Sequence, residues 1–315
     1  MRGAASQSDG GMAIDPHSSW SPAKARELLG LACRMVGVDY ERLQLLRFGT
    51  NAVYRLLPTA YVVRVARPGT DVAQIDREIA MAEYLKVVRF AAVRFASELC
   101  EHPVSVMDTT VSFWHWLEHQ PGSGPSPAQF GKLMHGFHRV TDGYHGELPA
   151  FNPLCFVADD LAALSSSKYV SVQDLRALRR WHTQFTEQLS AVRSDLHVGV
   201  LHGDAHIGNA LLSGGQPAII DFERLCRGPR EWDLIPAAIA PRRFGGAATD
   251  YQQFARAYGS DVTKWEHYEL FARIRELQTT TWRLRVDMTA RVQNESRRRL
   301  EYWRGIENEP VWRPF

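Results

Sequence analysis

The chain has 315 residues, which is long enough for one large domain or two lobes with an ample core. Hydrophobic residues make up 45% and charged residues 23%, and a formal net charge of +2 points to neither nucleic acid nor an anionic membrane as a partner. No apolar run approaches the length of a membrane-spanning helix. The four cysteines are scattered without a Cys-x-x-Cys pair, which indicates a reducing, cytoplasmic compartment rather than a disulfide framework.

Residues 1–19 are rich in glycine, serine and alanine and are expected to form a disordered tail, in which Met12 offers a second start. A helix is predicted from Ser21 to Gly37, because serine suits the N-cap, Pro22 the first helical position and glycine the end. Strands are predicted over residues 43–48, 52–57 and 61–66.

Gly49, Thr50 and Asn51 form the turn between the first two of these strands. A strand, a glycine-containing turn and a returning strand can lay backbone N–H groups over phosphates. An ordinary hairpin gives the same pattern. The turn therefore indicates phosphate binding only in combination with a basic residue such as Arg64 in the third strand.

A helix is predicted to start at Asp71 or Val72 and to reach Val88, and strands follow over residues 90–96, 104–107 and 111–116. The stretch 121–127, PGSGPSP, is typical of a linker. We therefore place the boundary here, between an N-lobe over residues 20–120 and a C-lobe over residues 121–315. Helices are predicted over 127–140 and 172–192, and the chain is expected to be mostly helical from residue 234 onward.

The stretch 198–223, VGVLHGDAHIGNALLSGGQPAIIDFE, carries the densest chemical signal. Short apolar runs over 198–201, 209–212 and 218–220 predict three strands, separated by a polar loop and a glycine turn. The two connections would bring Asp204, Asn209 and Asp221 toward one end of a small sheet. A turn is predicted at Gly228–Pro229, before a helix that begins near Trp232.

A carboxylate and a carboxamide five residues apart, with a second carboxylate at a strand end, offer the hard oxygen ligands that Mg²⁺ prefers. The remaining carboxylate can accept a proton from a hydroxyl nucleophile. Protein kinases combine these groups as H-R-D-x-x-x-x-N followed by a D-F-G aspartate. The corresponding residues here run from His202 to Asn209 and from Asp221 to Glu223.

These two motifs, H-G-D-x-x-x-x-N and I-D-F-E, resemble those of the aminoglycoside phosphotransferase and choline kinase branch of the protein-kinase-like superfamily. The resemblance covers about residues 43–235 by motif. It implies an α+β, two-lobed fold with a small β-rich N-lobe and a larger, mainly helical C-lobe. It also implies that Asp204 is the catalytic base, that Asn209 and Asp221 hold Mg²⁺, and that His202 braces the loop.

The resemblance also implies roles in nucleotide binding for residues of the N-lobe. Arg64 would clamp the α and β phosphates of ATP, in a position where most relatives have lysine. Glu78 is the expected helix partner of Arg64, with Glu83 as the alternative. The backbone of Trp116, Leu117 and Glu118 would pair with the adenine edge. For each of these residues, the alternative is a solvent-exposed or packing position without a role in nucleotide binding.

The function expected from this resemblance is transfer of the γ-phosphoryl group of ATP, with Mg²⁺, to a hydroxyl of a small molecule, for which antibiotics are one candidate class. A metal-dependent phosphoesterase is one alternative, with His202, Asp204, His206 and Asp221 as ligands of Zn²⁺. A catalytically weak, nucleotide-binding regulatory protein is the other, motivated by Arg64. The protein is expected to act as a monomer or weak homodimer, without nucleic acid or membrane partners.

Overall fold

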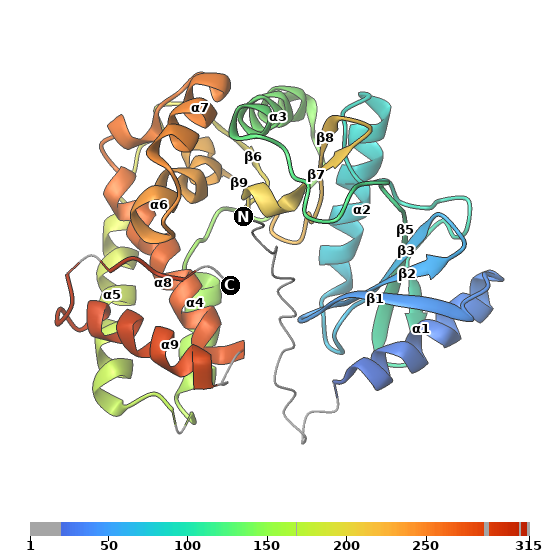
Figure 1. Cartoon of the computed structure of the whole chain (residues 1–315), viewed down its shortest axis with the longest axis horizontal. Coiled ribbons are helices and arrows are strands. Elements are labelled where there is room, and N and C mark those ends of the chain that lie inside the picture. Colours follow the sequence, from blue (N-terminus) through green and yellow to red (C-terminus); the bar gives the residue numbers. More distant parts are fainter. Residues whose placement is uncertain (1–19, 168, 287–289, 309, 314–315) are drawn as a thin grey trace, which may run out of the picture.

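The structure is a computed structural model that describes residues 20–167, 169–286, 290–308 and 310–313. The tail expected over residues 1–19 lies outside the described residues. Figure 1 shows a sheet-rich half, coloured blue to blue-green, beside a mainly helical half, coloured green to red. This arrangement confirms the predicted two-lobed, protein-kinase-like fold.

The N-lobe is built on one antiparallel sheet with the strand order β1-β2-β3-β5-β4. Its strands are β1 (Arg42–Phe48), β2 (Ala52–Leu57), β3 (Tyr61–Val65), β4 (Val104–Val106) and β5 (Thr109–His115). Along β2 the side chains alternate between buried and half-buried, as expected for a strand with one face on a core.

Helix α1 (Pro22–Val36) packs on this sheet and completes the N-lobe core. The side chain of Ser21 accepts a hydrogen bond from the backbone N–H of Lys24, and Gly37 ends the helix in the left-handed conformation, at φ 72°. Both ends are therefore as the sequence predicted. Leu28 on the helix and Phe113 on β5 belong to one buried cluster.

Helix α2 (Val72–Val87) lies between the sheet and the C-lobe (Figure 1). It begins at Asp71, whose carboxylate accepts a hydrogen bond from the backbone N–H of Ala73. Its buried residues Met81 and Leu85 belong to the larger core cluster, which consists mostly of C-lobe residues. The helix therefore couples the two lobes through apolar packing.

The C-lobe is mainly helical around this larger core. Its helices are α3 (Pro127–Val140), α4 (Cys155–Leu164), α5 (Val172–Leu189), α6 (Ile235–Arg243), α7 (Ala248–Tyr258), α8 (Tyr268–Val286) and α9 (Ala290–Trp303). Helices α3 and α7 pack against each other, with the rings of Phe130 and Phe254 5.6 Å apart. None of the described helices is both long enough and apolar enough to cross a membrane.

The stretch predicted as one small sheet forms two separate antiparallel ribbons. Strand β6 (Val198–Leu201) pairs with β9 (Cys226–Pro229), and β7 (Ala210–Ser213) pairs with β8 (Gln216–Ile219). The turn predicted at Gly228–Pro229 is therefore wrong, because both residues lie in β9. Glycine is needed at 228 for close packing, since a Cβ there would lie 2.4 Å from the Cβ of Phe151.

The strand predicted over residues 90–96 is also wrong, because this segment makes only isolated bridges to two different partners. Ala92 bridges to Ile219 of β8 in the C-lobe, and Phe95 bridges to Trp114 of β5 in the N-lobe. The backbone therefore crosses between the lobes and cannot continue either ladder. Apolar periodicity along the sequence does not distinguish such a crossing from a strand.

Candidate active site

The loop between β6 and β7 carries the predicted catalytic residues, and Asp233 fixes its start. The fully buried carboxylate of Asp233 accepts hydrogen bonds from the backbone N–H groups of His202, at 2.7 Å, and of Gly203, at 2.9 Å. His138 contacts the same carboxylate through Nε2, at 3.0 Å. A buried, charged acceptor with several donors holds the loop more firmly than neutral hydrogen bonds would.

Gly203 is required at its position in this loop. Its φ of +82° lies in the left-handed region, and a Cβ there would lie 2.0 Å from the carbonyl oxygen of Arg224. The indole N–H of Trp232 donates to the carbonyl oxygen of Gly203, at 3.0 Å. The loop therefore lies directly against the segment that follows Asp221.

The side chain of His202 is fully buried and uses both ring nitrogens inside the protein. Nε2 lies 2.9 Å from the carbonyl oxygen of Ile220, and Nδ1 lies 3.3 Å from the backbone N–H of Asp204. This pattern fits the tautomer in which Nε2 donates and Nδ1 accepts. These contacts connect the loop to the residue before Asp221 and match the bracing role expected for His202.

Asp204 lines a cavity of about 720 Å³ and forms an ion pair with Arg275 of α8. His206 lies beside it, with 3.8 Å between Nε2 and the carboxylate. Burial opposes ionisation of Asp204, but the charges of Arg275, His206 and Arg224 outweigh burial and hold the pKa of its carboxyl below the usual range. Asp204 is therefore a carboxylate at neutral pH.

Asn209 and Asp221, the predicted metal ligands, lie on neighbouring segments. The backbone N–H of Ile220 donates to the carbonyl oxygen of Asn209, at 3.0 Å, and the Asn209 amide nitrogen donates to the carbonyl oxygen of Asp204, at 2.9 Å. Because the amide nitrogen is engaged, the amide oxygen is the atom of this side chain that can coordinate a cation. Asp221 lines the cavity and has a φ of +68°, a strained conformation found at functional sites.

These oxygens fit Mg²⁺, for which a carboxylate and a carboxamide oxygen are typical ligands beside phosphate and water. The zinc set considered above does not assemble, because both ring nitrogens of His202 are engaged. Among the described residues, no group of three or more histidine, cysteine, aspartate or glutamate side chains has metal-binding geometry.

In the N-lobe, Arg64 of β3 and Glu78 of α2 form a bidentate ion pair, with distances of 2.5 and 2.9 Å. Glu78 is 1% exposed. Glu83, the alternative partner, instead lies 3.1 Å from Lys86 on the helix surface. The pairing of Arg64 with Glu78 is therefore confirmed, because α2 directs Glu78, and not Glu83, toward the sheet.

The predicted turn at Gly49, Thr50 and Asn51 faces the same site. Gly49 and Thr50 line the cavity, and the Asn51 side-chain amide donates to the carboxylate of Glu223. The indole N–H of Trp20 donates to the carbonyl oxygen of Gly49, at 2.9 Å, which ties the turn to the start of α1.

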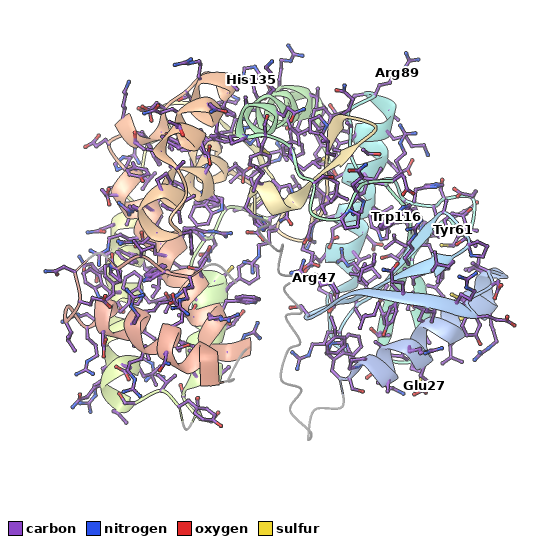
Figure 2. All side chains as sticks on the ribbon, in the orientation of Figure 1. Glu27, Arg47, Tyr61, Arg89, Trp116 and His135 are labelled. Atoms are coloured by element: carbon purple, nitrogen blue, oxygen red, sulfur yellow. The ribbon has the colours of Figure 1, made fainter. Side chains whose placement is uncertain are left out.

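Trp116, Leu117 and Glu118, the predicted hinge, do not line the cavity around Asp204. The backbone N–H of Trp116 already donates to the carbonyl oxygen of Ala60, at 2.7 Å, and the carbonyl oxygen of Leu117 contacts His119 Nδ1, at 2.7 Å. Figure 2 shows Trp116 on the N-lobe side of the molecule, away from the helical half. An adenine contact here would therefore depend on the remaining backbone groups of residues 116–118.

The assembled motifs agree with a comparison of the whole sequence with protein families. Residues 43–277 match the phosphotransferase enzyme family. The chain belongs to this family. No curated protein matches the phosphotransferase by sequence.

Solved structures show that the phosphotransferase has the fold of small-molecule kinases. An amicoumacin kinase in complex with AMP-PNP, Ca²⁺ and its ligand matches with a TM-score of 0.70 at 13% identity, covering 90% of this chain and 95% of that one. The choline kinase LicA from Streptococcus pneumoniae matches with a TM-score of 0.63 at 13% identity, covering 90% and 100%. A microcompartment-associated aminopropanol kinase matches with a TM-score of 0.66 at 14% identity, covering 88% and 95%.

Three residues of the phosphotransferase site were not singled out from the sequence. Arg275 contacts Asp204 from α8, and no local pattern could have indicated a partner 71 residues away. Arg47, at the end of β1 facing the helical half in Figure 2, lies 3.5 Å from the Asp221 carboxylate. Glu223 lies 3.6 Å from Arg64, and its place in the I-D-F-E motif was the signal available.

Glu223 lies in an acidic cluster beside Asp221 and Glu78. Burial and the charge of Asp221 raise the pKa of Glu223 to about 7, against the lowering influence of Arg64 and Arg47. This side of the phosphotransferase site is therefore rich in carboxylate oxygens, each close to a basic group.

Proposed function

We propose that this phosphotransferase transfers the γ-phosphoryl group of ATP to a hydroxyl group of a small molecule. The observation that carries the proposal is the convergence of Asp204, Asn209 and Asp221 beside one cavity between the lobes. The family and the folds of the kinases it resembles support a small-molecule kinase.

In this proposal Asp204 orients the acceptor hydroxyl and accepts its proton. The low pKa of its carboxyl keeps it ionised, so the oxygen that must accept a proton is available at neutral pH. A positioned general base contributes about 10²–10⁴-fold to a rate. His202 and Asp233 act through Asp204 by fixing the backbone of its loop.

The oxygens of Asn209 and Asp221 would hold Mg²⁺, which supplies neutralisation of phosphate charge when bound. Arg64, fixed by Glu78, would contact the phosphates, because a guanidinium binds phosphate bidentately. Gly49, Thr50 and Asn51 would cover the phosphates, and residues 116–118 would meet the adenine. The amicoumacin kinase crystallised with AMP-PNP supports a nucleotide in this site.

The two alternative functions have distinct signatures. A phosphoesterase would need a bound metal ion and would hydrolyse phosphate esters without nucleotide. Both ring nitrogens of His202 are engaged within the protein, which weighs against His202 as a zinc ligand. A nucleotide-binding regulator would bind ATP without forming a product. The intact Arg64–Glu78 pair favours a working phosphate site despite the arginine.

The decisive experiment measures ADP release and phosphorylated product for a panel of hydroxylated antibiotics, amino alcohols and sugars. We expect Asp204→Asn to bind AMP-PNP and Mg²⁺ normally and to lose at least about 10²-fold in turnover. Asp195→Asn, an exposed carboxylate at the surface, is the matched control.

Full turnover in Asp204→Asn would refute the assignment of the base. Phosphate-ester hydrolysis without nucleotide, with zinc retained, would favour the phosphoesterase. Thermal stabilisation by nucleotide without any product would favour the regulator. The four free thiols support a reducing, cytoplasmic location, and light scattering would test the expected monomer or weak homodimer.

A further inference from the structure

The cavity of about 720 Å³ extends well beyond the groups that the proposed phosphoryl transfer uses. One end lies at Gly49, Thr50 and Asp221, where the nucleotide phosphates would bind. Asp204 and Arg275 lie along its wall, and the cavity continues between α3, α6, α7 and α8. A molecule whose hydroxyl meets Asp204 would therefore place the rest of its body against these four helices.

The helical wall of this cavity is predominantly apolar and aromatic. Its side chains include Phe130, Ile239, Ala240, Phe244, Tyr251 and Trp282. The hydroxyl of Tyr251 donates to Asp261, at 2.6 Å, which leaves its ring as the part available to a ligand. Such a surface binds apolar rings or chains by removing them from water, without directional contacts.

The carboxylates that line the cavity are nearly all engaged by arginines. Asp160 lies 2.7 Å from Arg285 and also accepts a hydrogen bond from Thr281. Asp204 pairs with Arg275, Asp221 lies near Arg47, and Glu223 lies near Arg64. Among the described residues, only the exposed Asp250 in the first turn of α7 lines the cavity without a basic side chain within ion-pair distance.

A ligand with several ammonium groups would find few free carboxylates in this cavity to offset the loss of hydration of its charges. Each buried ammonium that lacks an anionic or hydrogen-bonding partner carries a desolvation cost. The guanidinium of Arg224 also lines the cavity, over the ring of Phe156 at 3.9 Å, and would repel cations. The balance of charge and apolar surface thus selects against polycations.

We infer that the acceptor of this phosphotransferase is a bulky hydroxylated molecule with an extended apolar face and at most one positive charge. This inference rests on the proposed function for the hydroxyl that meets Asp204. The apolar face lies on the wall formed by α6 and α7, and a single ammonium group has Asp250 as its partner. A compact, strongly cationic aminoglycoside does not fit this description.

The test is equilibrium binding to the full chain, measured by calorimetry with AMP-PNP and Mg²⁺ present. The probes are erythromycin A, which has hydroxyls, one amine and an apolar lactone face, kanamycin A, a hydroxylated polycation, and methyl β-glucoside, which has hydroxyls but no apolar face. We expect erythromycin A to bind at least tenfold more tightly than either other probe.

Ala240→Asp places a charge in the wall and should weaken erythromycin binding at least tenfold. Ala237→Asp, on the same wall, is the second variant if the first does not fold. Ala163→Asp, on the exposed side of α4 and outside the cavity, should leave binding unchanged. Thermal unfolding and AMP-PNP binding check that each variant is folded.

The inference is overturned if kanamycin A binds as tightly as erythromycin A, if no probe binds, or if charged residues in the wall leave erythromycin binding unchanged. Phosphoryl transfer is measured separately with the same probes. Tight binding of the apolar probe without ADP release would leave the ligand preference standing and count against the kinase activity. Efficient phosphorylation of kanamycin A would support the kinase activity and would count against the proposed ligand preference.

Discussion

The guanidinium of Arg275 on α8 forms an ion pair with the carboxylate of Asp204, which lies in the loop between β6 and β7. The same guanidinium donates to the side chain of Gln278, at 3.2 Å, one helical turn further along α8. Arg275 is therefore fixed by its own helix and orients the carboxylate proposed to act as base. The site thus depends on α8 as well as on the two sequence motifs.

We predict that Arg275→Ala lowers kcat by about tenfold, because a carboxylate without its partner samples positions outside hydrogen-bond reach of the acceptor. The KM for ATP should change little, since Arg275 does not contact the predicted nucleotide residues. Steady-state kinetics with one acceptor separates the two constants. Arg298→Ala, at a half-buried ion pair with Glu307, serves as the control, and an unchanged kcat in Arg275→Ala would contradict the positioning role.

We predict that Glu78→Gln raises the KM for ATP and lowers the free energy of unfolding by about 3–5 kcal/mol, the usual cost of removing one partner of a buried ion pair. Glu83→Gln, on the same helix, removes an exposed pair with Lys86 and should cost about 0–1 kcal/mol. Urea unfolding and nucleotide titration measure both effects. An equal loss in the free energy of unfolding for the two variants would show that the buried Arg64–Glu78 pair stabilises the protein no more than the exposed pair does.

We predict that Gly203→Ala abolishes activity and destabilises the protein more than Gly37→Ala does. Both glycines have a positive φ, which costs an alanine about 1–2 kcal/mol. At Gly37 nothing lies within 4 Å of the Cβ that alanine would add, whereas at Gly203 this Cβ would overlap the carbonyl of Arg224. Thermal unfolding of the two variants separates the backbone strain from the overlap, and similar losses would argue against the close approach at Gly203.

We predict that stability falls as the pH drops below about 6.5, the unperturbed pKa of histidine, in part through His138. Burial lowers the pKa of His138 despite the adjacent Asp233 carboxylate. The unfolded chain therefore binds a proton that the folded protein does not, so stability is complete above the unfolded pKa and declines as the pH falls toward the lower, folded pKa. One proton limits the slope to about 1.4 kcal/mol per pH unit.

Urea unfolding at several pH values tests this linkage. His138→Gln keeps a donor toward Asp233 and should reduce the slope below pH 6.5, while His102→Gln, at an exposed position before β4, should not. An unaltered slope in His138→Gln would show that another group carries the dependence.

Much of the local structure follows from patterns that the sequence contains. The start of α1 at Ser21–Pro22, the alternation along β2 and the bounds of α3 were predicted because capping residues and apolar periodicity are local signals. The segment 90–96 was predicted wrongly as a strand, since its partners lie on two different sheets. Glycine at 228 was interpreted as a turn for a similar reason, because the approach of Phe151 is a property of the packed chain.

The sequence by itself determined the family and the chemical groups of the proposed active site, because Asp204, Asn209 and Asp221 occur in motifs with fixed spacing and flanking apolar runs. Only the tertiary structure decided that Glu78 rather than Glu83 meets Arg64, and that Arg275 meets Asp204. It also decided which side chains form the apolar wall of the cavity. These contacts join elements that pack through non-directional apolar forces, so no local pattern in the chain specifies them.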